Sequence, residues 1–270
     1  MIVLKIGGDI FRRGLGRSLA DDIRRVREEI GEKMVIVHGG GDEVTEIAEK
    51  LGKKQIFVTS PEGIRSRYTD EETVEIYAMV MAGRINKAIV KWLISAGIPA
   101  VGLSGIDGSI LVAERKRKLV IVDERGRKRI IDGGFTGKIS IVKPELLMIL
   151  LEENYVPVIA PIAIGIENEY LNVDSDRAAG QIAGALMAEK LIFLTDVPGI
   201  RIGEEYLKKI SLREAKELLP KIGPGMNMKV IASIEAIEAG AKEAIIACGL
   251  TQDPITSALN GLNGTVITTE

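Results

Sequence analysis

Short apolar runs alternate along this chain with longer segments in which apolar residues recur every three or four positions. The longest segment, from Thr69-Asp70 to Ser95 before Gly97 and Pro99, predicts a helix of about seven turns. The runs have the length of buried strands and lie at residues 2–6, 34–37, 56–58, 100–104, 156–164, 191–194, 244–247 and 265–268. Strands that alternate with helices predict an α/β fold with a mostly parallel sheet and helices on both faces.

Polar residues predict where several helices begin. Ser18 in an S-x-x-D motif and Asp42 are candidate N-caps, and Ser211 forms a capping box with Glu214. Small residues from Ala178 to Ala188 predict a closely packed helix.

Three regions interrupt the alternation of strands and helices. Residues 59–68 are polar and contain proline and glycine, so they predict an irregular connection. Residues 110–131 hold short apolar runs around a turn at Arg125-Gly126, which predicts a β-ribbon. Residues 165–168 are a polar break and a candidate boundary between two lobes, 1–165 and 166–270.

Composition narrows the class of protein. The 270 residues are 46% apolar, 27% charged and 4% aromatic, with a net charge of −2, as in a globular protein that has an aliphatic core. Nothing in this charge indicates binding to nucleic acid or to an anionic membrane, and no apolar run has membrane-spanning length. The single cysteine, Cys248, and the single histidine, His38, exclude an intrachain disulfide and a His-rich or four-cysteine metal site. We therefore expect a cytoplasmic protein without a metal site of its own.

Glycine turns follow several predicted strands. They lie at Gly7-Gly8, at residues 39–41, at Gly199 and at residues 223–225. Such turns gather at the carboxyl ends of parallel strands, and their free backbone N–H groups can bind an anion. Each turn alone is equally consistent with an ordinary tight turn. The segment from Asp132 to Lys138 is not a P-loop, because its glycine spacing is too short.

Two lysines lie beside these turns. Lys5 is near the end of the first strand and Lys229 follows the turn at 223–225, while Asp176 is placed to orient them. Lysines in such positions can stabilise the charge of a transferring phosphoryl group. Taken singly, Lys229 is also consistent with a solvated helix residue, and Asn172 with a turn residue.

Five motifs taken together resemble the amino acid kinase family, and within it the N-acetylglutamate kinase branch. They occur in the family's order along nearly the whole chain: Lys5-Ile-Gly-Gly8, Val37-His-Gly-Gly-Gly41, Asn172-x-x-x-Asp176, Leu194-Thr-Asp-Val-Pro-Gly199 and Gly225-Met-x-x-Lys229. The resemblance implies a three-layer αβα sandwich with an N-terminal acceptor lobe and a C-terminal ATP lobe. It also implies transfer of the γ-phosphoryl group of ATP, bound with Mg²⁺, to a carboxylate.

The resemblance also assigns roles to residues. It implies that Lys5 and Lys229 stabilise the transferring phosphoryl group and that Asp176 orients both. It places Gly40, Gly41, Arg67 and Asn172 around the acceptor. Residues expected near the nucleotide are Gly7, Gly8, Thr195, Asp196, Gly199, Gly225 and Met226.

Residues 59–69 depart from ordinary acetylglutamate kinases, which have a shorter Gly-Leu-Arg-x-Thr at this point. The longer form resembles archaeal kinases of lysine and arginine biosynthesis, whose aminoadipate or glutamate substrate is linked through its amino group to a LysW-like carrier protein. Free N-acetylglutamate is the alternative acceptor, and a non-catalytic amino acid sensor or a nucleotide-binding scaffold are the alternatives to an enzyme. The family suggests a homodimer, and without an N-terminal helical extension we expect no larger ring and no feedback by arginine.

Residues 114–129 concentrate positive charge, with eight basic and three acidic side chains. One interpretation is a solvated edge ribbon whose charges prevent aggregation. The other is a docking surface for an acidic carrier protein.

Overall fold

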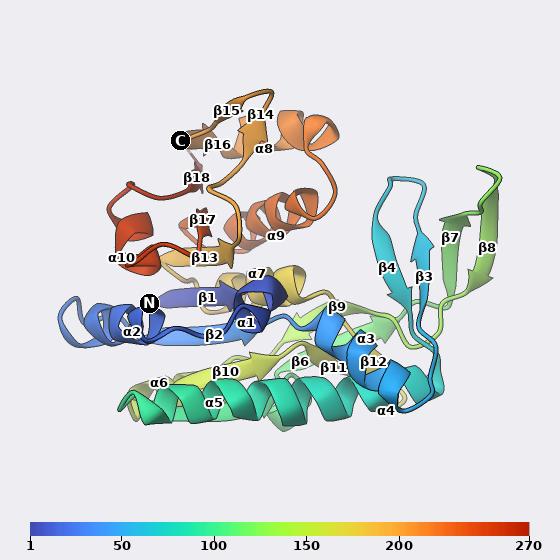
Figure 1. Cartoon of the computed structure of the whole chain (residues 1–270), viewed down its shortest axis with the longest axis horizontal. Coiled ribbons are helices and arrows are strands. Elements are labelled where there is room, and N and C mark those ends of the chain that lie inside the picture. Colours follow the sequence, from blue (N-terminus) through green and yellow to red (C-terminus); the bar gives the residue numbers. More distant parts are fainter. Residues whose placement is uncertain (270) are drawn as a thin grey trace.

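The computed structural model describes residues 1–269 and is built around one eight-stranded sheet (Figure 1). The strand order is β16-β18-β17-β13-β1-β2-β10-β5. All neighbouring strands pair in parallel except β17 and β18, which are antiparallel. The strands are β1 (Ile2–Ile6), β2 (Met34–His38), β5 (Ala100–Ser104), β10 (Val156–Ala160), β13 (Lys190–Thr195), β16 (Lys209–Ser211), β17 (Glu243–Cys248) and β18 (Thr265–Thr268).

Helices cover both faces of this sheet, and alternate residues of each strand contact different helices. On β1, Ile2, Leu4 and Ile6 pack in the core on one face, whereas Val3 packs in the core on the other. The first face is covered by α2 (Arg17–Glu28), α3 (Gly41–Lys50), α4 (Glu71–Ala78), α5 (Asn86–Ser95) and α10 (Pro254–Leu259). The second face is covered by α6 (Glu145–Glu152), α7 (Ser175–Ala185), α8 (Leu212–Leu218) and α9 (Met226–Glu238). The predicted three-layer αβα sandwich is confirmed.

A second sheet and three hairpins complete the architecture. The sheet has the order β12-β11-β6-β9, and its strands are β6 (Leu111–Arg115), β9 (Gly137–Val142), β11 (Ile162–Gly165) and β12 (Tyr170–Asn172). The hairpins are β3 (Ile56–Thr59) with β4 (Arg65–Tyr68), β7 (Lys118–Val122) with β8 (Lys128–Asp132), and β14 (Arg201–Ile202) with β15 (Glu205–Tyr206). The first two stand side by side beyond the central sheet (Figure 1), and β3 contacts β7. The predicted ribbon is confirmed for its last two strands, which form β7–β8, whereas its first run at residues 110–113 belongs to β6 of the second sheet.

The prediction of an irregular connection at residues 59–68 is wrong. Only residues 60–64 form a turn, and β4 pairs with β3 over four residues. The polar sequence of β4 hid this strand, because it lies outside the core and needs no apolar alternation.

The predicted single strand at residues 156–164 is also two strands. β10 belongs to the central sheet and β11 to the second sheet, with Pro161 between them. A continuous apolar run cannot reveal this change of sheet, because both strands are buried.

Two of the predicted N-caps are wrong. The helix α2 begins at Arg17 after Gly16, and the Ser18 hydroxyl instead donates to the backbone oxygen of Gln252 at 2.6 Å. The helix α3 begins at Gly41 after Gly40, so Asp42 lies inside its first turn, where it accepts a hydrogen bond from Arg12. The capping box of Ser211 and Glu214 is confirmed.

The long helix expected between residues 70 and 95 is continuous but changes its winding in the middle. Met79–Ile85 forms a π-helix between α4 and α5, and Asp70 caps the start by accepting from the Thr73 amide. A π segment shifts side chains around the helix axis and occurs often at functional sites. Two short 3₁₀ turns, Asp107–Ser109 and Leu219–Lys221, and the helix α1 (Gly8–Arg12) were not predicted. No helix within residues 1–269 is long and apolar enough to cross a membrane.

Candidate active site

The first two glycine turns touch each other at the carboxyl ends of β1 and β2. A Cβ atom built on Gly39 would lie 3.1 Å from the Gly8 amide nitrogen and 3.6 Å from Nζ of Lys5. A Cβ on Gly8 would lie 3.3 Å from the Gly40 nitrogen. Only glycine fits this contact without displacement, so backbone N–H groups of both turns lie close to Lys5.

Lys5, Asp176 and Lys229 form one buried cluster of charges. Asp176 Oδ1 lies 2.7 Å from Nζ of Lys5, and Asp176 Oδ2 lies 3.1 Å from Nζ of Lys229. Lys5 is 4% exposed and Asp176 is 6% exposed. Lys5 reaches this position because it shares a strand face with Val3, which packs on the same side of the sheet as α7. The carboxylate holds two ammonium groups together that would otherwise repel each other.

The surroundings act in opposite directions on two neighbouring carboxyl groups. Burial alone raises the pKa of Asp176, but the charges and hydrogen bonds of Lys5 and Lys229 together hold this pKa below its ordinary value. Burial and the nearby charge of Asp176 raise the pKa of Asp174, which caps α7 by accepting from the Arg177 amide at 2.9 Å. Asp176 is therefore the ionised partner that both lysines need.

The turn at Gly40 is held against the π-helix. Gly40 has a φ of 154°, and a Cβ atom there would lie 2.1 Å from Cδ1 of Ile85 and 3.2 Å from Sδ of Met81. Any other residue would therefore have to displace the side chains of the π segment. The absence of a side chain at Gly40 therefore allows the turn to pack directly against the π-helix.

Arg67 connects the β3–β4 hairpin to the same glycine turn. Its Nη2 donates to the backbone oxygen of Gly41 at 2.6 Å and to Oγ1 of Thr45 at 2.9 Å, and its Nη1 donates to Gln55. The guanidinium also lies over the ring of Phe57 at 5.0 Å from the ring centre. Arg67 is 8% exposed, so its orientation is fixed by the protein before any ligand binds.

Asn172 lies at the end of β12, close to Arg67 in the fold. Its Nδ2 donates to Oγ1 of Thr69 at 3.0 Å, and its amide donates to the backbone oxygen of Phe135 at 2.9 Å. These contacts tie the second sheet to the segment that carries Arg67.

A pocket of about 480 Å³ contains the predicted acceptor residues Gly40, Gly41, Arg67 and Asn172. The glycine turn at residues 39–41, the start of α7 and residues of the β3–β4 and β7–β8 hairpins line this pocket. Lining residues that the sequence did not single out include Phe57, Tyr77, Met81, Thr136, Asp174, Arg177 and Met228, whereas Lys116 belongs to the basic stretch at residues 114–129. Tyr77, Met81, Arg177 and Met228 lie on helical segments, and Phe57 and Thr136 lie on or beside strands, so no single periodic pattern marks them. Asp174 and Met228 lie inside the motifs Asn172–Asp176 and Gly225–Lys229, but neither motif specifies the residue at these positions.

The residues predicted around the nucleotide lie at the carboxyl end of β13 and at the start of α9. Thr195 ends β13, its hydroxyl lies 3.3 Å from Asp196, and the Gly7 amide donates to the oxygen of Leu194 at 3.1 Å. Gly225 precedes Met226, the first residue of α9, with a φ of 84°. Gly7 and Gly8 therefore lie between the glycine turn at residues 39–41 and the end of β13.

Gly199 has a φ of 150°, and a Cβ atom there would lie 2.6 Å from Oγ1 of Thr265. The same hydroxyl accepts from the Ile200 amide at 2.9 Å, so the turn after β13 is held against β18.

His38 is unsuited to act as a base. It is fully buried, with Nδ1 3.0 Å from the backbone oxygen of Gly39 and Nε2 3.4 Å from Nδ2 of Asn86. Burial lowers the pKa of His38 to about 4, so the ring is neutral near pH 7 and has too little affinity for a proton to act as an effective base. Within residues 1–269, no group of three or more His, Cys, Asp or Glu side chains could hold a metal ion.

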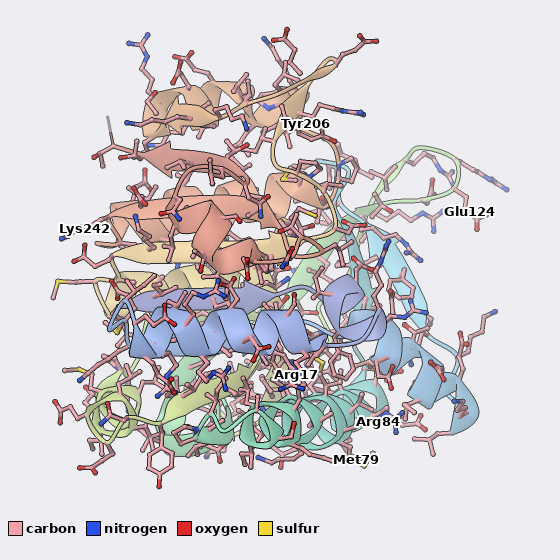
Figure 2. All side chains as sticks on the ribbon, turned by 60° about the vertical axis from the view of Figure 1, so that its left-hand side comes forward. Arg17, Met79, Arg84, Glu124, Tyr206 and Lys242 are labelled. Atoms are coloured by element: carbon pink, nitrogen blue, oxygen red, sulfur yellow. The ribbon has the colours of Figure 1, made fainter. Side chains whose placement is uncertain are left out.

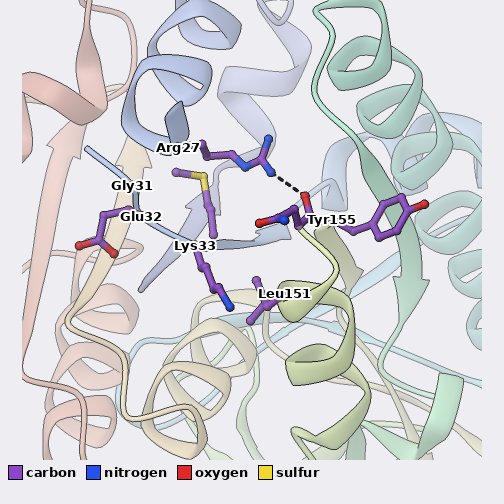
Figure 3. A pocket seen from close by; sticks show the side chains of 8 residues that line it. Arg27, Gly31, Glu32, Lys33, Leu151 and Tyr155 are labelled. Carbon is purple, nitrogen blue, oxygen red and sulfur yellow. Dashed lines mark hydrogen bonds between the residues drawn. The ribbon is translucent and has the colours of Figure 1, made fainter. Parts of the chain in front are cut away.

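A smaller pocket of about 100 Å³ lies at the opposite ends of the strands, before β2 and β10 (Figure 3). Arg27 donates there to the backbone oxygen of Asn154 at 2.6 Å, and Tyr155 lies beside it. Ligands of open parallel sheets bind at the carboxyl ends of the strands, and none of the predicted site residues lines this pocket.

Comparisons with known proteins agree with this arrangement. Two proteins named LysW-aminoadipate/LysW-glutamate kinase are similar over their full lengths. The one from Saccharolobus solfataricus is 46% identical over 268 residues, covering 99% of both chains, and the one from Sulfolobus acidocaldarius is 47% identical over 268 residues, covering 99% of this chain and 100% of the relative.

Solved structures share the fold at lower identity. N-acetylglutamate synthase from Neisseria gonorrhoeae has a TM-score of 0.79 at 24% identity, over 100% of this chain and 59% of that chain. Carbamate kinase from Giardia lamblia has a TM-score of 0.67 at 18% identity, over 99% and 98% of the two chains. A sequence model of the amino acid kinase family matches residues 1–248, and this chain therefore belongs to the amino acid kinase family.

Proposed function

We propose that this protein transfers the γ-phosphoryl group of ATP to the side-chain carboxylate of aminoadipate or glutamate linked by its amino group to a carrier protein. A carboxylate oxygen would attack the γ-phosphorus, the bond to the bridging oxygen of ADP would break, and ADP would leave with that electron pair. The product is an acyl phosphate. The names of the full-length relatives support the acceptor, and family membership supports the use of ATP.

The cluster of Lys5, Asp176 and Lys229 is the observation that carries this proposal. A carboxylate acceptor is already ionised, so the reaction needs no general base, and the buried His38, whose pKa is lowered to about 4, is too weakly basic to supply one. What the transfer needs is fixed positive charge around the phosphoryl oxygens. Two lysines held by one carboxylate beside the glycine turns supply it. A sensor of amino acids would have no need to bury these three charges together.

We assign the acceptor to the pocket of about 480 Å³, with Gly40, Gly41, Arg67 and Asn172 as binding residues. We assign the nucleotide to Gly7, Gly8, Thr195, Asp196, Gly199, Gly225 and Met226. The acceptor lobe would span residues 1–165 and the ATP lobe residues 166–270, with α7 contributing Asp176 to the boundary between them.

Magnesium would arrive bound to ATP and neutralise phosphate charge. Protein side chains that fit such a complex are cations and backbone N–H groups rather than a set of carboxylates. Lys5, Lys229 and the glycine turns are groups of this kind.

We assign the docking of an acidic carrier to the β7–β8 hairpin. Figure 2 shows Glu124 at the end of a loop that projects away from the body of the protein. The exposed cations of this hairpin lie beside the pocket, because Lys116 and Leu119 at its base line the pocket. We further propose a cytoplasmic homodimer on the family resemblance alone.

The proposal is tested by assaying purified protein with MgATP and three acceptors: carrier-linked aminoadipate, carrier-linked glutamate and free N-acetylglutamate. Hydroxylamine traps acyl phosphates as hydroxamates, and ADP release gives the rate. We expect turnover with at least one carrier-linked acceptor and a much lower kcat/KM for the free one. Selectivity between the two linked acids should be about 10–200-fold at most, because they differ by one methylene. No hydroxamate with any acceptor would overturn the proposal, and a higher kcat/KM with N-acetylglutamate would identify the alternative substrate.

A further inference from the structure

His38 and Asn86 form a buried pair beside the glycine turn at residues 39–41, and both residues are 0% exposed. Nδ2 of Asn86 donates to the backbone oxygen of Leu103 at 3.1 Å and to that of Val158 at 2.8 Å. These two carbonyl groups on β5 and β10 determine which end of the amide is the nitrogen. The same Nδ2 lies 3.4 Å from Nε2 of His38, so the ring faces a hydrogen-bond donor on this side.

The neighbours of the His38 ring assign its proton to one nitrogen. The ring is neutral near pH 7, so it carries a single N–H group. Nδ1 lies 3.0 Å from the backbone oxygen of Gly39, which can only accept, whereas Nε2 faces the amide nitrogen of Asn86, which can only donate. A proton on Nε2 would place a donor against a donor and two lone pairs against each other. The proton therefore lies on Nδ1, and His38 donates to Gly39.

This hydrogen bond fixes the peptide group between Gly39 and Gly40. No peptide bond in residues 1–269 is cis, so the N–H of Gly40 points in the direction opposite to the oxygen of Gly39. The ring holds that oxygen on the buried side, which directs the N–H away from the ring. A Cβ atom built on Gly8 would lie 3.3 Å from the Gly40 nitrogen, and one built on Gly39 would lie 3.6 Å from Nζ of Lys5. Within residues 1–269 no group accepts from the Gly40 amide, which is therefore a free donor close to Lys5.

A peptide group between two glycines depends on such a hydrogen bond for its orientation. Rotation of the peptide plane changes ψ of Gly39 and φ of Gly40, and neither residue has a Cβ atom that would oppose the rotation. In the described part of the chain, the His38 ring is the one group that donates to the Gly39 oxygen. Without this donor the peptide could rotate and turn the Gly40 N–H away from Lys5.

We propose that His38 is a positioning residue for phosphoryl transfer, because its Nδ1–H group holds the Gly39 oxygen and so directs the Gly40 N–H towards the transferring phosphoryl group. This inference rests on the proposed function and extends it to a residue that contacts no substrate. A donor that is already oriented stabilises the charge of the transition state without reorganisation. Asn86, the first residue of α5, fixes the ring in turn and so connects the long helix to the glycine turn.

The test exchanges the ring for side chains that keep or lose the donor. In His38→Asn, Nδ2 is bonded to Cγ as Nδ1 is in histidine, so it can still donate to Gly39. His38→Leu fills more of the space but has no donor. We expect kcat to fall about 10–100-fold in His38→Leu and to stay within about threefold of wild type in His38→Asn. The loss is smaller than the about 100–1000-fold for a deleted donor, because the freed peptide still visits the active orientation. KM for ATP and KM for the acceptor should stay within about threefold in both variants.

A role in packing alone predicts the reverse order of the two variants. Asparagine leaves a cavity at this buried position, whereas leucine fills most of it, so packing would make His38→Asn the less stable and less active variant. The matched control is Asp22→Asn, at another residue that is 0% exposed, whose carboxylate accepts from the amides of Ile255 and Thr256 at the start of α10. It should lower Tm and leave kcat within about twofold, which shows that lost stability alone does not slow the reaction.

The position of the ring proton can be measured without turnover. Since the chain has a single histidine, a long-range proton–nitrogen correlation spectrum of isotope-labelled protein near pH 7 reports both ring nitrogens without assignment. We expect the signal of a protonated nitrogen at Nδ1 and that of an unprotonated nitrogen at Nε2. A proton on Nε2 would overturn the inference, because His38 could not then donate to Gly39.

The kinetic results separate the failure of this inference from the failure of the proposed function. Wild-type turnover together with a kcat in His38→Leu that equals or exceeds that in His38→Asn overturns the positioning role alone. A loss in His38→Leu that appears in KM for both substrates, together with a lowered Tm, also overturns it, because it would mean a structural role. A wild type that phosphorylates no acceptor overturns the proposed function, and the positioning role with it.

Discussion

The buried cluster of Lys5, Asp176 and Lys229 beside the glycine turns and the β7–β8 hairpin use the same residue types under opposite conditions. Asp176 holds Lys5 in the buried interior and Lys229 at a partly buried position, so water screens these ammonium groups only weakly. On the hairpin, Arg127 and Arg129 share Asp123, while the exposed side chains of Lys118, Arg125 and Lys128 form no ion pair within residues 1–269. Charges of the first kind can act on a bound group over a few ångströms, whereas charges of the second kind act mainly on how a partner approaches.

The difference predicts how sensitive each region is to substitution. A buried charge must keep its partner, and removing one member leaves an uncompensated charge. An exposed charge contributes little by itself and is weakened by salt. Substitutions in the cluster should therefore change the chemical step, and substitutions on the hairpin should change encounter only.

The largest effect is expected from the lysines of the cluster. Lys5→Ala and Lys229→Ala should each lower kcat about 100–1000-fold, the usual consequence of removing one preorganised electrostatic donor. KM for the acceptor should change much less, which steady-state kinetics with saturating ATP will show. Circular dichroism and Tm serve as controls for folding. A variant that keeps more than about a third of wild-type kcat would remove that lysine from the chemistry.

A charge that has no partner should also be destabilising in the buried region. Protonation of His38 tests this expectation directly. The pKa of His38 is about 4 in the folded protein and about 6.5 when unfolded, so the unfolded state binds the proton more tightly. The stabilising contribution is complete above pH 6.5 and declines as the pH falls towards 4, by about 3 kcal/mol in total.

Urea unfolding between pH 4 and 7 measures this decline, and His38→Asn should lack that part of it. Since the chain has a single histidine, its ring protons in an NMR spectrum report the folded pKa without assignment. If the ring titrates near pH 6.5, burial does not disfavour the charged form of His38, and the contrast drawn between buried and exposed charges fails at this residue.

Much of the buried cluster and of the glycine turns beside it could be predicted from the sequence. Glycine turns, Lys5, Asp176 and Lys229 lie in contiguous motifs whose order identifies the family, and apolar runs reveal the strands that carry them. The structure brings Lys5, Asp176 and Lys229 together as the motifs indicated.

The pocket wall could not be predicted in this way. Lys116, Thr136 and Arg177 meet only through pairing between β6, β9 and β12 and through the position of α7. Strand β4 is polar, and although the sequence predicted a strand at residues 56–58, its pairing with β4 is seen only in the register of Phe57 with Arg67. Such contacts depend on tertiary pairing, which no local periodicity encodes. The predicted caps at Ser18 and Asp42 failed because glycines one or two residues earlier start those helices.

Arg67 lies between the two regions, and its substitution should have an intermediate effect. Arg67→Lys loses the planar fork that contacts Gly41, Thr45 and Gln55, so the glycine turn and the acceptor lose a fixed set of donors. We expect KM for the acceptor to rise about tenfold to fiftyfold, corresponding to a lost charge-assisted hydrogen bond, with KM for ATP nearly unchanged. Isothermal titration with ATP alone is the control. Equal weakening of ATP and acceptor would indicate that the whole lobe has collapsed.

The smallest effect is expected from the exposed cations of the hairpin. Arg115 is unsuitable for this test, because its Nε donates to the backbone oxygen of Gly134 at 2.6 Å and its guanidinium lies over Phe135 at 4.1 Å. Lys118, Arg125 and Lys128 are exposed, and reversing all three to Glu removes positive charge without disturbing the pocket. Exposed pairs contribute about 0.2–1 kcal/mol each, so KM for the carrier-linked acceptor should rise about threefold to tenfold at low salt.

Salt distinguishes steering from a loss of specific contacts. At 0.15 M salt the Debye length is about 8 Å, so the difference between wild type and the triple variant should shrink as salt is added. KM for ATP should stay constant, and reversal of the exposed Lys143, Lys208 and Lys209 should leave the carrier KM unchanged. An unchanged carrier KM in the hairpin variant at low salt would mean that the hairpin charges only keep an exposed edge soluble. The buried cluster would then be the one region of the two in which positive charge acts on the substrate.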